Sequence, residues 1–144
     1  MVLTDADKQK LLDARRKKRS LEFAAERYDT AKDLYLKAQS IDGMPKGTAS
    51  GAGLESYVIR KDKALVEYMT AQIAYLSAVA DAYTVIDKIV MQIDTLEKVS
   101  RIREFCKAYF IEGKSVRKAA LEQGLAESTA WGYKREIVGG TQEE

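Results

Sequence analysis

The placement of helix-breaking residues constrains the fold of this chain more than any other feature. The 144 residues include a single proline, Pro45, and nine glycines. The glycines lie in the segment 43–53, at Gly113 and Gly124, and in the segment 132–140. The long stretches between them contain no helix breaker, and 46% of the residues are hydrophobic, which suffices for a core. This distribution predicts an all-α protein.

Two long helices are expected before residue 98. The first begins at a cap, Thr4 or Asp5, and runs to about Gln39. Residues 40–53 read SIDGMPKGTASGAG, a loop composition, and a second helix begins near Leu54. Apolar residues in both helices recur at spacings of three, four or seven, as in a coiled coil. Residues 1–98 are therefore predicted to form a long antiparallel helical hairpin. The first seam is Leu21, Ala24, Tyr28, Ala31, Tyr35 and Ala38, and the second is Leu54, Val58, Leu65, Tyr68, Tyr75, Val79, Ala82, Ile86, Ile89, Ile93 and Leu96.

A side stripe on the second long helix indicates a further neighbour. It consists mainly of alanines and lies beside the main seam, so the helix has two apolar stripes and more than one packing partner. We expect a homo-oligomer held through the long helices. The tyrosines of the hairpin fall at helical spacing, which favours packing over a base-stacking role. The stripe is Tyr57, Ala64, Ala71, Ala74, Ala78 and Val85.

The character of the chain changes at about Val99. Short helices are expected, with Gly113 ending one of them in a left-handed conformation and Ser115 capping the next. A turn at Gly124 precedes a last helix over residues 127–138, and the tail 139–144 is expected to be disordered. The first short helix has an apolar face made of Ile102, Phe105, Cys106, Tyr109 and Phe110.

Residues 115–138, SVRKAALEQGLAESTAWGYKREIV, have the pattern of a helix-turn-helix. Ala119 and Ala120 are small enough for two helices to approach closely, and Gly124 can adopt a positive φ angle without steric cost. The second helix then buries one face, formed by Leu125, Ala130, Tyr133 and Ile137. Residues 99–138 are therefore predicted to be a small DNA-binding domain, although the same pattern suits a three-helix core with no nucleic-acid role.

The outward residues of this segment are the predicted DNA contacts. Cations would neutralise phosphates, and polar residues near the start of the recognition helix would face base edges in the major groove. Trp131 is either a packing residue or an exposed aromatic for DNA or a protein. The phosphate contacts would be Arg117, Lys118, Lys134 and Arg135, and the groove-facing residues would be Glu127, Ser128, Thr129 and Trp131.

A second basic feature lies on the first helix. Five successive cations cover more than one helical turn, so no single face can hold them all. They are candidates for a second phosphate contact, or a solvated segment paired with Asp13 and Glu22. The two interpretations are equally supported. The cations are Arg15, Arg16, Lys17, Lys18 and Arg19.

Catalysis, cofactors and metals are not expected. The chain has no histidine, one cysteine (Cys106), and no phosphate-binding G-x-x-x-x-G-K-[ST] loop. No apolar run approaches the roughly 20 residues that span a bilayer, and the start lacks the layout of a signal peptide. We expect a protein of the cytoplasm, with no enzymatic activity and no membrane partner. Basic ends around an acidic middle permit nucleic-acid binding.

The motifs of the C-terminal third also carry a family resemblance. Tyr109, Ile111, Gly113, Lys114 and Ser115 form a turn that is followed by Ala120 and Gly124 in the two-helix segment. This arrangement resembles the C-terminal domain of phage sigma-factor-like transcriptional activators of the ArpU/RinA type. The segment 43–47, GMPKG, is similar to a loop between two long helices in such proteins.

The resemblance implies a phage or prophage regulator that binds double-stranded DNA at a promoter in a bacterial host, alongside RNA polymerase. The chain departs from the family pattern at Gln123, usually apolar, at Ala126, usually a Ser or Thr cap, and at Gly132 within the recognition helix.

Two other functions fit the same sequence. A DNA-packaging subunit of the small-terminase kind also combines a helix-turn-helix with an oligomerising hairpin. A ring of eight or nine copies would indicate that function, whereas a dimer or tetramer favours the regulator. The third hypothesis is a protein-binding module whose hairpin captures a host or phage protein, and Gly132 motivates it because glycine weakens the recognition helix.

Overall fold

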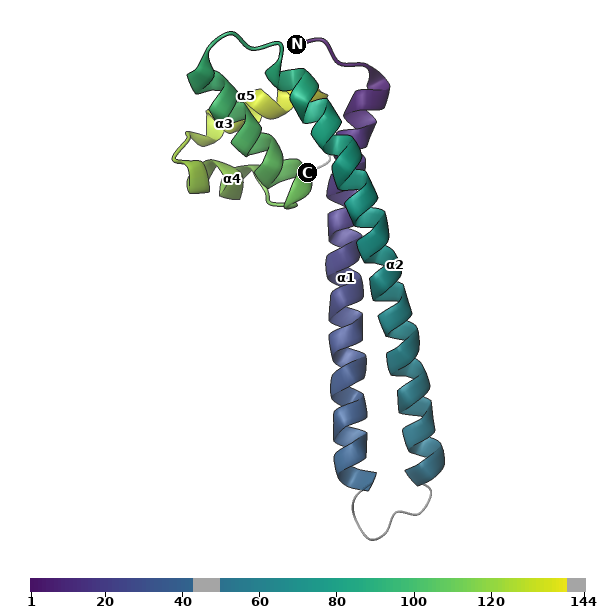
Figure 1. Cartoon of the computed structure of the whole chain (residues 1–144). Helices are drawn as coiled ribbons and strands as arrows, with labels where there is room; N and C mark the ends of the chain where they lie inside the picture. Colours follow the sequence, from purple (N-terminus) through teal and green to yellow (C-terminus); the bar gives the residue numbers. More distant parts are fainter. Residues whose placement is uncertain (43–49, 140–144) are drawn as a thin grey trace. The chain divides into compact units, whose positions relative to one another are not determined.

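The computed structural model describes residues 1–42 and 50–139, and these residues form helices and their connections, with no strand among them. The all-α prediction is confirmed for this part of the chain. The elements in Figure 1 are α1 (Asp5–Asp42), α2 (Ser50–Val90), α3 (Leu96–Cys106), η1 (Lys107–Ile111), α4 (Val116–Gln123) and α5 (Glu127–Val138).

The predicted helical hairpin is present, since α1 and α2 pack side by side in opposite directions (Figure 1). Both helices extend further into the predicted loop than expected. Helix α1 ends at Asp42 rather than Gln39, and α2 begins at Ser50 rather than Leu54. The middle of the predicted loop, residues 43–49, lies outside the described residues, as does the tail from residue 140.

The end of the second long helix differs from the prediction. The seam was expected to continue to Leu96, but α2 ends at Val90 and α3 begins at Leu96. The last turn tightens, because the Gln92 and Ile93 amides donate to the carbonyls of Ile89 and Val90, three residues back. Ile93 therefore lies in the connection and is half-buried against the core of the following helices.

The chain divides into two compact units. One contains Met1–Arg19 together with Tyr75–Glu144, and the other contains Ser20–Ala74. The first unit holds the main core, to which both long helices and all the short helices contribute. The predicted domain boundary at residue 98 stays a prediction. The described helices after residue 98 share one hydrophobic core with Leu11 of α1 and Ile86 of α2. The largest fully buried side chains of this core include Tyr109, Phe105, Phe110, Leu11, Ile86, Ile89, Ile102 and Ile137.

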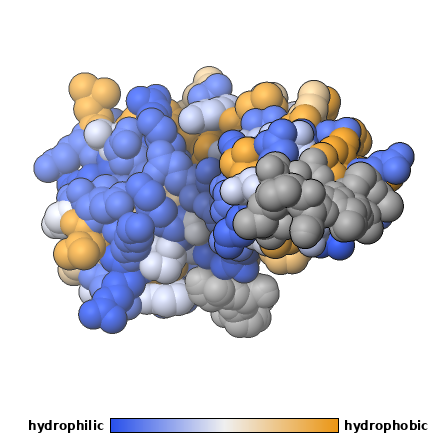
Figure 2. Space-filling view, turned by 90° about the horizontal axis from the view of Figure 1, so that it is seen from below, coloured by the Kyte–Doolittle hydropathy of each residue, from blue (hydrophilic) through white to orange (hydrophobic). Residues whose placement is uncertain are grey.

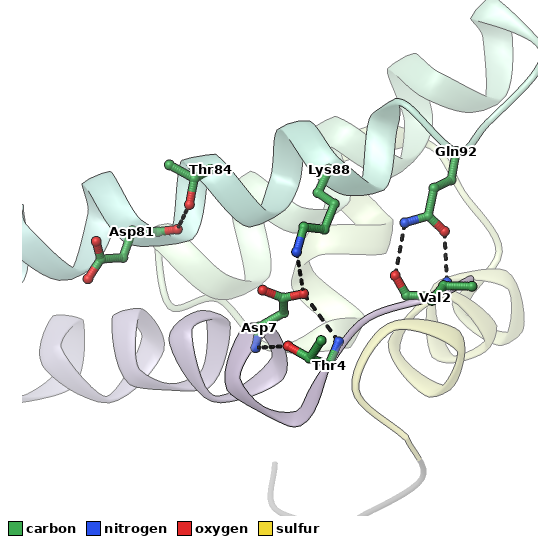
Figure 3. A network of polar contacts seen from close by, with 7 residues as sticks. All are labelled: Val2, Thr4, Asp7, Asp81, Thr84, Lys88 and Gln92. Carbon is green, nitrogen blue, oxygen red and sulfur yellow. Dashed lines mark hydrogen bonds and ion pairs between the residues drawn. The ribbon is translucent and has the colours of Figure 1, made fainter.

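Polar contacts fasten the start of α1 to the end of α2 (Figure 3). The Asp7 amide donates to Thr4 Oγ1 at 3.1 Å, and the Thr4 amide donates to Asp7 Oδ2 at 3.2 Å. Thr4 therefore caps α1 reciprocally with Asp7. Lys88 Nζ donates to the same Asp7 oxygen at 2.8 Å, and Gln92 exchanges two hydrogen bonds with the Val2 backbone.

In the unit Ser20–Ala74, the contact between α1 and α2 buries fewer and smaller side chains than the core of the first unit. Tyr28 and Tyr68 stack with their ring centroids 6.0 Å apart, and Arg27 pairs with Glu67 at 3.1 Å. These contacts confirm the packing role predicted for Tyr28 and Tyr68. The surface seen in Figure 2 is mixed, with apolar side chains interrupting a mostly hydrophilic exterior. Within the part of the chain that the structure describes, no helix has an apolar stretch long enough to cross a membrane.

Candidate nucleic-acid interface

Two short helices, α4 and α5, meet at a turn built by local sequence. The Ser115 hydroxyl accepts a hydrogen bond from the Lys118 amide at 3.1 Å, so Ser115 caps α4 as predicted. Gly124 ends α4 with a φ of 69°, a left-handed conformation that glycine adopts without strain. Ala119 and Ala120 are buried, which lets the neighbouring helices approach closely. The predicted positive φ at Gly124 is confirmed.

One face of helix α5 is buried, whereas the first turn of the helix is exposed to solvent. Ala130, Tyr133 and Ile137 are buried as predicted, and Leu125 in the turn is half-buried. The first turn of α5 is exposed, and Arg135 is exposed near its other end. Ala126 precedes the helix without a side-chain cap, so the amides of this first turn lack the usual hydroxyl partner. The exposed residues of the first turn are Glu127, Ser128 and Thr129.

Lys134 differs from the sequence prediction. It was expected to face outward with Arg135, but it is only 3% exposed. Its Nζ lies 5.2 Å from the centroid of the Trp131 ring, one helical turn earlier, and the Trp131 indole donates to Glu127 Oε2 at 3.3 Å. The lysine stem is therefore packed and its charge is directed at an aromatic face. This burial removes Lys134 from the exposed cations, and Trp131 is half-buried rather than fully exposed.

Gly132 occupies the interior of α5 without a packing reason. A Cβ atom built there would meet nothing within 4 Å. Glycine in a helix interior lowers stability by about 1 kcal/mol relative to alanine. No packing contact of the described residues requires glycine at this position. The position leaves a stretch of bare backbone on α5, where glycine permits close approach of another chain or ligand.

Arg15, the first of the five cations on α1, is a structural residue. Its Nη1 donates to the carbonyl of Tyr109 at 2.7 Å and to that of Lys114 at 2.8 Å. Its guanidinium carbon lies 3.9 Å from the centroid of the Tyr109 ring, and the residue is 6% exposed. A phosphate contact is thus the wrong role for Arg15, because its guanidinium is committed to backbone carbonyls inside the protein.

The π-helical turn η1 explains why carbonyls within it, including that of Tyr109, need outside partners. The Glu112 amide donates to the Lys107 carbonyl, five residues back, and the Lys114 amide donates to that of Ala108, six residues back. This wide register shifts the next carbonyls away from the usual helical donors. Arg15 binds one of them, and the Tyr75 hydroxyl of α2 donates to the Ile111 carbonyl at 2.7 Å.

Of the other four cations of the basic turn, Lys18 lies beside the loop that leads into α4. Gly113 in this loop has a φ of 73° and carries no Cβ. A Cβ atom added to it would lie only 3.0 Å from Lys18 Cγ, so the Lys18 side chain packs closely against the loop. Arg16 and Arg19 are exposed, whereas Lys17 and Lys18 are half-buried. Arg16 makes a loose pair with Asp13 at 3.6 Å, and both side chains are open to solvent.

The structure therefore brings together two basic segments that are about 100 residues apart in sequence. The Lys114 carbonyl bonded to Arg15 immediately precedes the α4 cap, Ser115. Two exposed cations follow that cap at Arg117 and Lys118. The positive end of the α4 dipole lies at the same loop, and Arg16 and Arg19 are exposed close to Arg15 in sequence.

Lys114 in this loop is paired with two carboxylates, one in the loop and one on α4. Its Nζ lies 2.8 Å from Glu112 Oε1 and 2.6 Å from Glu122 Oε1. The hydrogen bonds with Glu112 and Glu122 raise the pKa of Lys114 above its usual 10.5, so it stays charged. We therefore do not count Lys114 among the cations that offer charge to a ligand.

The chain's single cysteine, Cys106, is buried. Burial raises the pKa of the Cys106 thiol to about 12, which leaves it protonated and unreactive at neutral pH. Among the residues that the structure describes, no group of three metal-ligating side chains lies close together.

Sequence reasoning missed the two residues that support the loop, Arg15 as an anchor and Tyr75 as a donor. The run of five consecutive cations could have indicated a buried one. It covers more than one turn of a helix that packs on one side, so at least one cation must face inward. Comparisons with protein-family models, curated proteins and solved structures found no match for this chain.

Proposed function

We propose that this chain is a DNA-binding regulator of a phage or prophage, with α4 and α5 as a helix-turn-helix. The observation that carries the proposal is the turn at Gly124, which joins two short helices over buried Ala119 and Ala120. The first turn of the second helix is left exposed and polar. These are the features that a recognition helix needs to enter a major groove.

The exposed side chains then take separate roles. Ser128 and Thr129, with Glu127, face base edges, because they occupy the exposed start of α5. Arg117 and Lys118 on α4 and Arg135 on α5 neutralise phosphates. Bare backbone at Gly132 allows α5 to approach the duplex closely.

The basic turn of α1 extends this surface in our proposal. Arg16 and Arg19 replace Arg15 and Lys134 as phosphate contacts, because the latter two are buried. Contacts from two parts of the chain would fix the orientation of α5 on the duplex. The hydrogen bonds of Arg15 hold the α1 segment against the loop before α4, which makes that arrangement rigid.

A titration of phage-genome fragments at low and near-physiological salt tests the proposal. The parent should retain a sequence-selective complex at the higher salt. Ser128→Ala should change the ranking of fragments, since a good base contact contributes about 1–3 kcal/mol of discrimination. Ser100→Ala, an exposed serine on α3, is the matched control and should leave the ranking unchanged.

Loss of all selectivity in the parent would count against a regulator. Protein capture is the second candidate function, because Leu121 on α4 is 78% exposed beside the proposed DNA surface. Leu121→Ser should leave DNA binding intact and abolish capture of a phage or host protein if that candidate is right.

A further inference from the structure

The outward face of α2 carries an apolar stripe that the sequence seams did not include. Successive steps along it are seven, three, four, three and seven residues, a heptad pattern. It lies apart from the seam that packs against α1, and five of its six members are more than half exposed. The stripe consists of Ile59, Val66, Met69, Ile73, Leu76 and Tyr83.

The middle of the stripe is surrounded by few charged residues. Residues 64–80 contain a single charged side chain, Glu67, and that carboxylate is paired with Arg27 of α1. The exposed neighbours Thr70, Ser77 and Ala80 are uncharged. A solvated helix face normally carries charges, and a row of exposed large apolar residues marks a contact surface.

We propose that this stripe is the interface with a second copy of the chain, with the two α2 helices paired antiparallel. The charges at the two ends of the stripe favour a second copy and an antiparallel direction. The N-terminal end carries Arg60 and Lys63 with Asp62, a net positive charge, and the C-terminal end carries Asp81 and Asp87 with Lys88, a net negative charge. Antiparallel pairing of two copies places the net basic end of each helix opposite the net acidic end of the other.

The residue order fits a two-fold axis in the middle of the stripe. An axis near Ala71 places Met69 opposite Ile73 and Val66 opposite Leu76 of the second copy. One patch then serves both chains, as in an isologous dimer. Parallel pairing would instead set Lys63 beside Lys63 and Asp81 beside Asp81. This inference does not depend on DNA binding.

Sedimentation of the full chain over a concentration series tests the interface. The parent should form dimers, and Met69→Glu with Ile73→Glu should raise the dimer dissociation constant at least tenfold. Both side chains are exposed in the single chain, so the variant should keep its helical circular dichroism spectrum. Phe23→Glu with Leu36→Glu replaces two exposed apolar residues of α1 and is the matched control that should still dimerise.

Crosslinking tests the direction of the pairing. Chains with Lys63→Cys mixed with chains with Ser77→Cys should be joined by a short thiol-reactive crosslinker, because antiparallel pairing brings these positions together. Lys63→Cys alone should give no crosslinked product. The native Cys106 is buried and does not compete. A monomeric parent, a dimer or ring unaffected by the double glutamate variant, or crosslinking of Lys63→Cys alone would overturn the proposal.

Discussion

The two compact units of this protein differ in what holds them together. The unit of Met1–Arg19 and Tyr75–Glu144 buries large side chains, among them Phe105, Tyr109 and Phe110. In the unit Ser20–Ala74, the buried residues among those described are two alanines, Ala31 and Ala64.

The difference predicts that two stretches of the same helix pair differ in stability. Burying an aromatic or branched side chain contributes several times more than burying alanine, because stabilisation follows the apolar area removed from water. The Ser20–Ala74 unit should therefore open locally at lower free energy than the other unit. Such a region gains most from a partner that covers its exposed apolar residues.

The largest expected effect is at the centre of the larger core. Phe110→Ala should lower the free energy of unfolding by about 3–5 kcal/mol, because it leaves a cavity among fully buried residues. Denaturant unfolding followed by circular dichroism measures this change. A loss below about 1 kcal/mol would show that this unit is not the better packed one.

Arg15→Ala should have the next largest effect, about 3 kcal/mol. The change removes the donor from two backbone carbonyls, those of Tyr109 and Lys114, and hydrogen bonds from charged groups contribute about 1.5–3 kcal/mol each. The exposed neighbour provides the control, since Arg16→Ala should stay within about 0.5 kcal/mol of the parent. Equal effects of the two changes would contradict the anchoring role of Arg15.

In the Ser20–Ala74 unit, Tyr28→Ala should cost about 1 kcal/mol, because it removes the stacked pair with Tyr68. Amide hydrogen exchange sharpens the comparison between the units. Protection should fall for residues 20–40 and 53–74 and stay unchanged around Phe105 and Phe110. A loss of protection across both units would mean that they unfold as one.

The smallest effect concerns pH and the cap of α1. The hydrogen bond from Lys88, together with that from the Thr4 amide, holds the pKa of Asp7 below its usual 3.8. The carboxylate therefore stabilises the fold above pH 3.8, and this stabilisation disappears as the pH falls through the lower folded-state value. Thermal unfolding should show parent and Asp7→Asn converging below pH 3.8, with the parent more stable at neutral pH. A constant difference between them would contradict this role of Asp7.

The sequence predicted features that arise from local chemistry. Helical periodicity anticipated the hairpin, and the Ser115 cap and the left-handed Gly113 and Gly124 follow from neighbouring residues alone. The end of α2 at Val90 was missed, because Gln92 is fastened there by Val2, about 90 residues away.

The candidate site was less predictable for the same reason. Arg15 is buried against Tyr109, which is 94 residues away in sequence, so helical spacing could not reveal this partner. Lys134 packs on Trp131, three residues earlier on α5, a neighbour that helical spacing does indicate. The contact of Lys18 with Gly113 depends on how α1 packs near η1. The roles of Ser128, Thr129 and Arg135 in DNA binding stay predictions.

The salt dependence of DNA affinity is the measurement that tests the proposed surface most directly. Each phosphate contact contributes about 0.9 to the slope of log affinity against log salt. The parent should have a steep slope, and Arg117→Ala with Lys118→Ala, or Arg16→Ala with Arg19→Ala, should each reduce it by roughly 2. Lys32→Ala with Lys37→Ala removes equal charge from exposed positions in the Ser20–Ala74 unit and should leave the slope unchanged. Equal reductions in all three variants, or no DNA binding by the parent, would contradict a DNA surface formed by α1, α4 and α5.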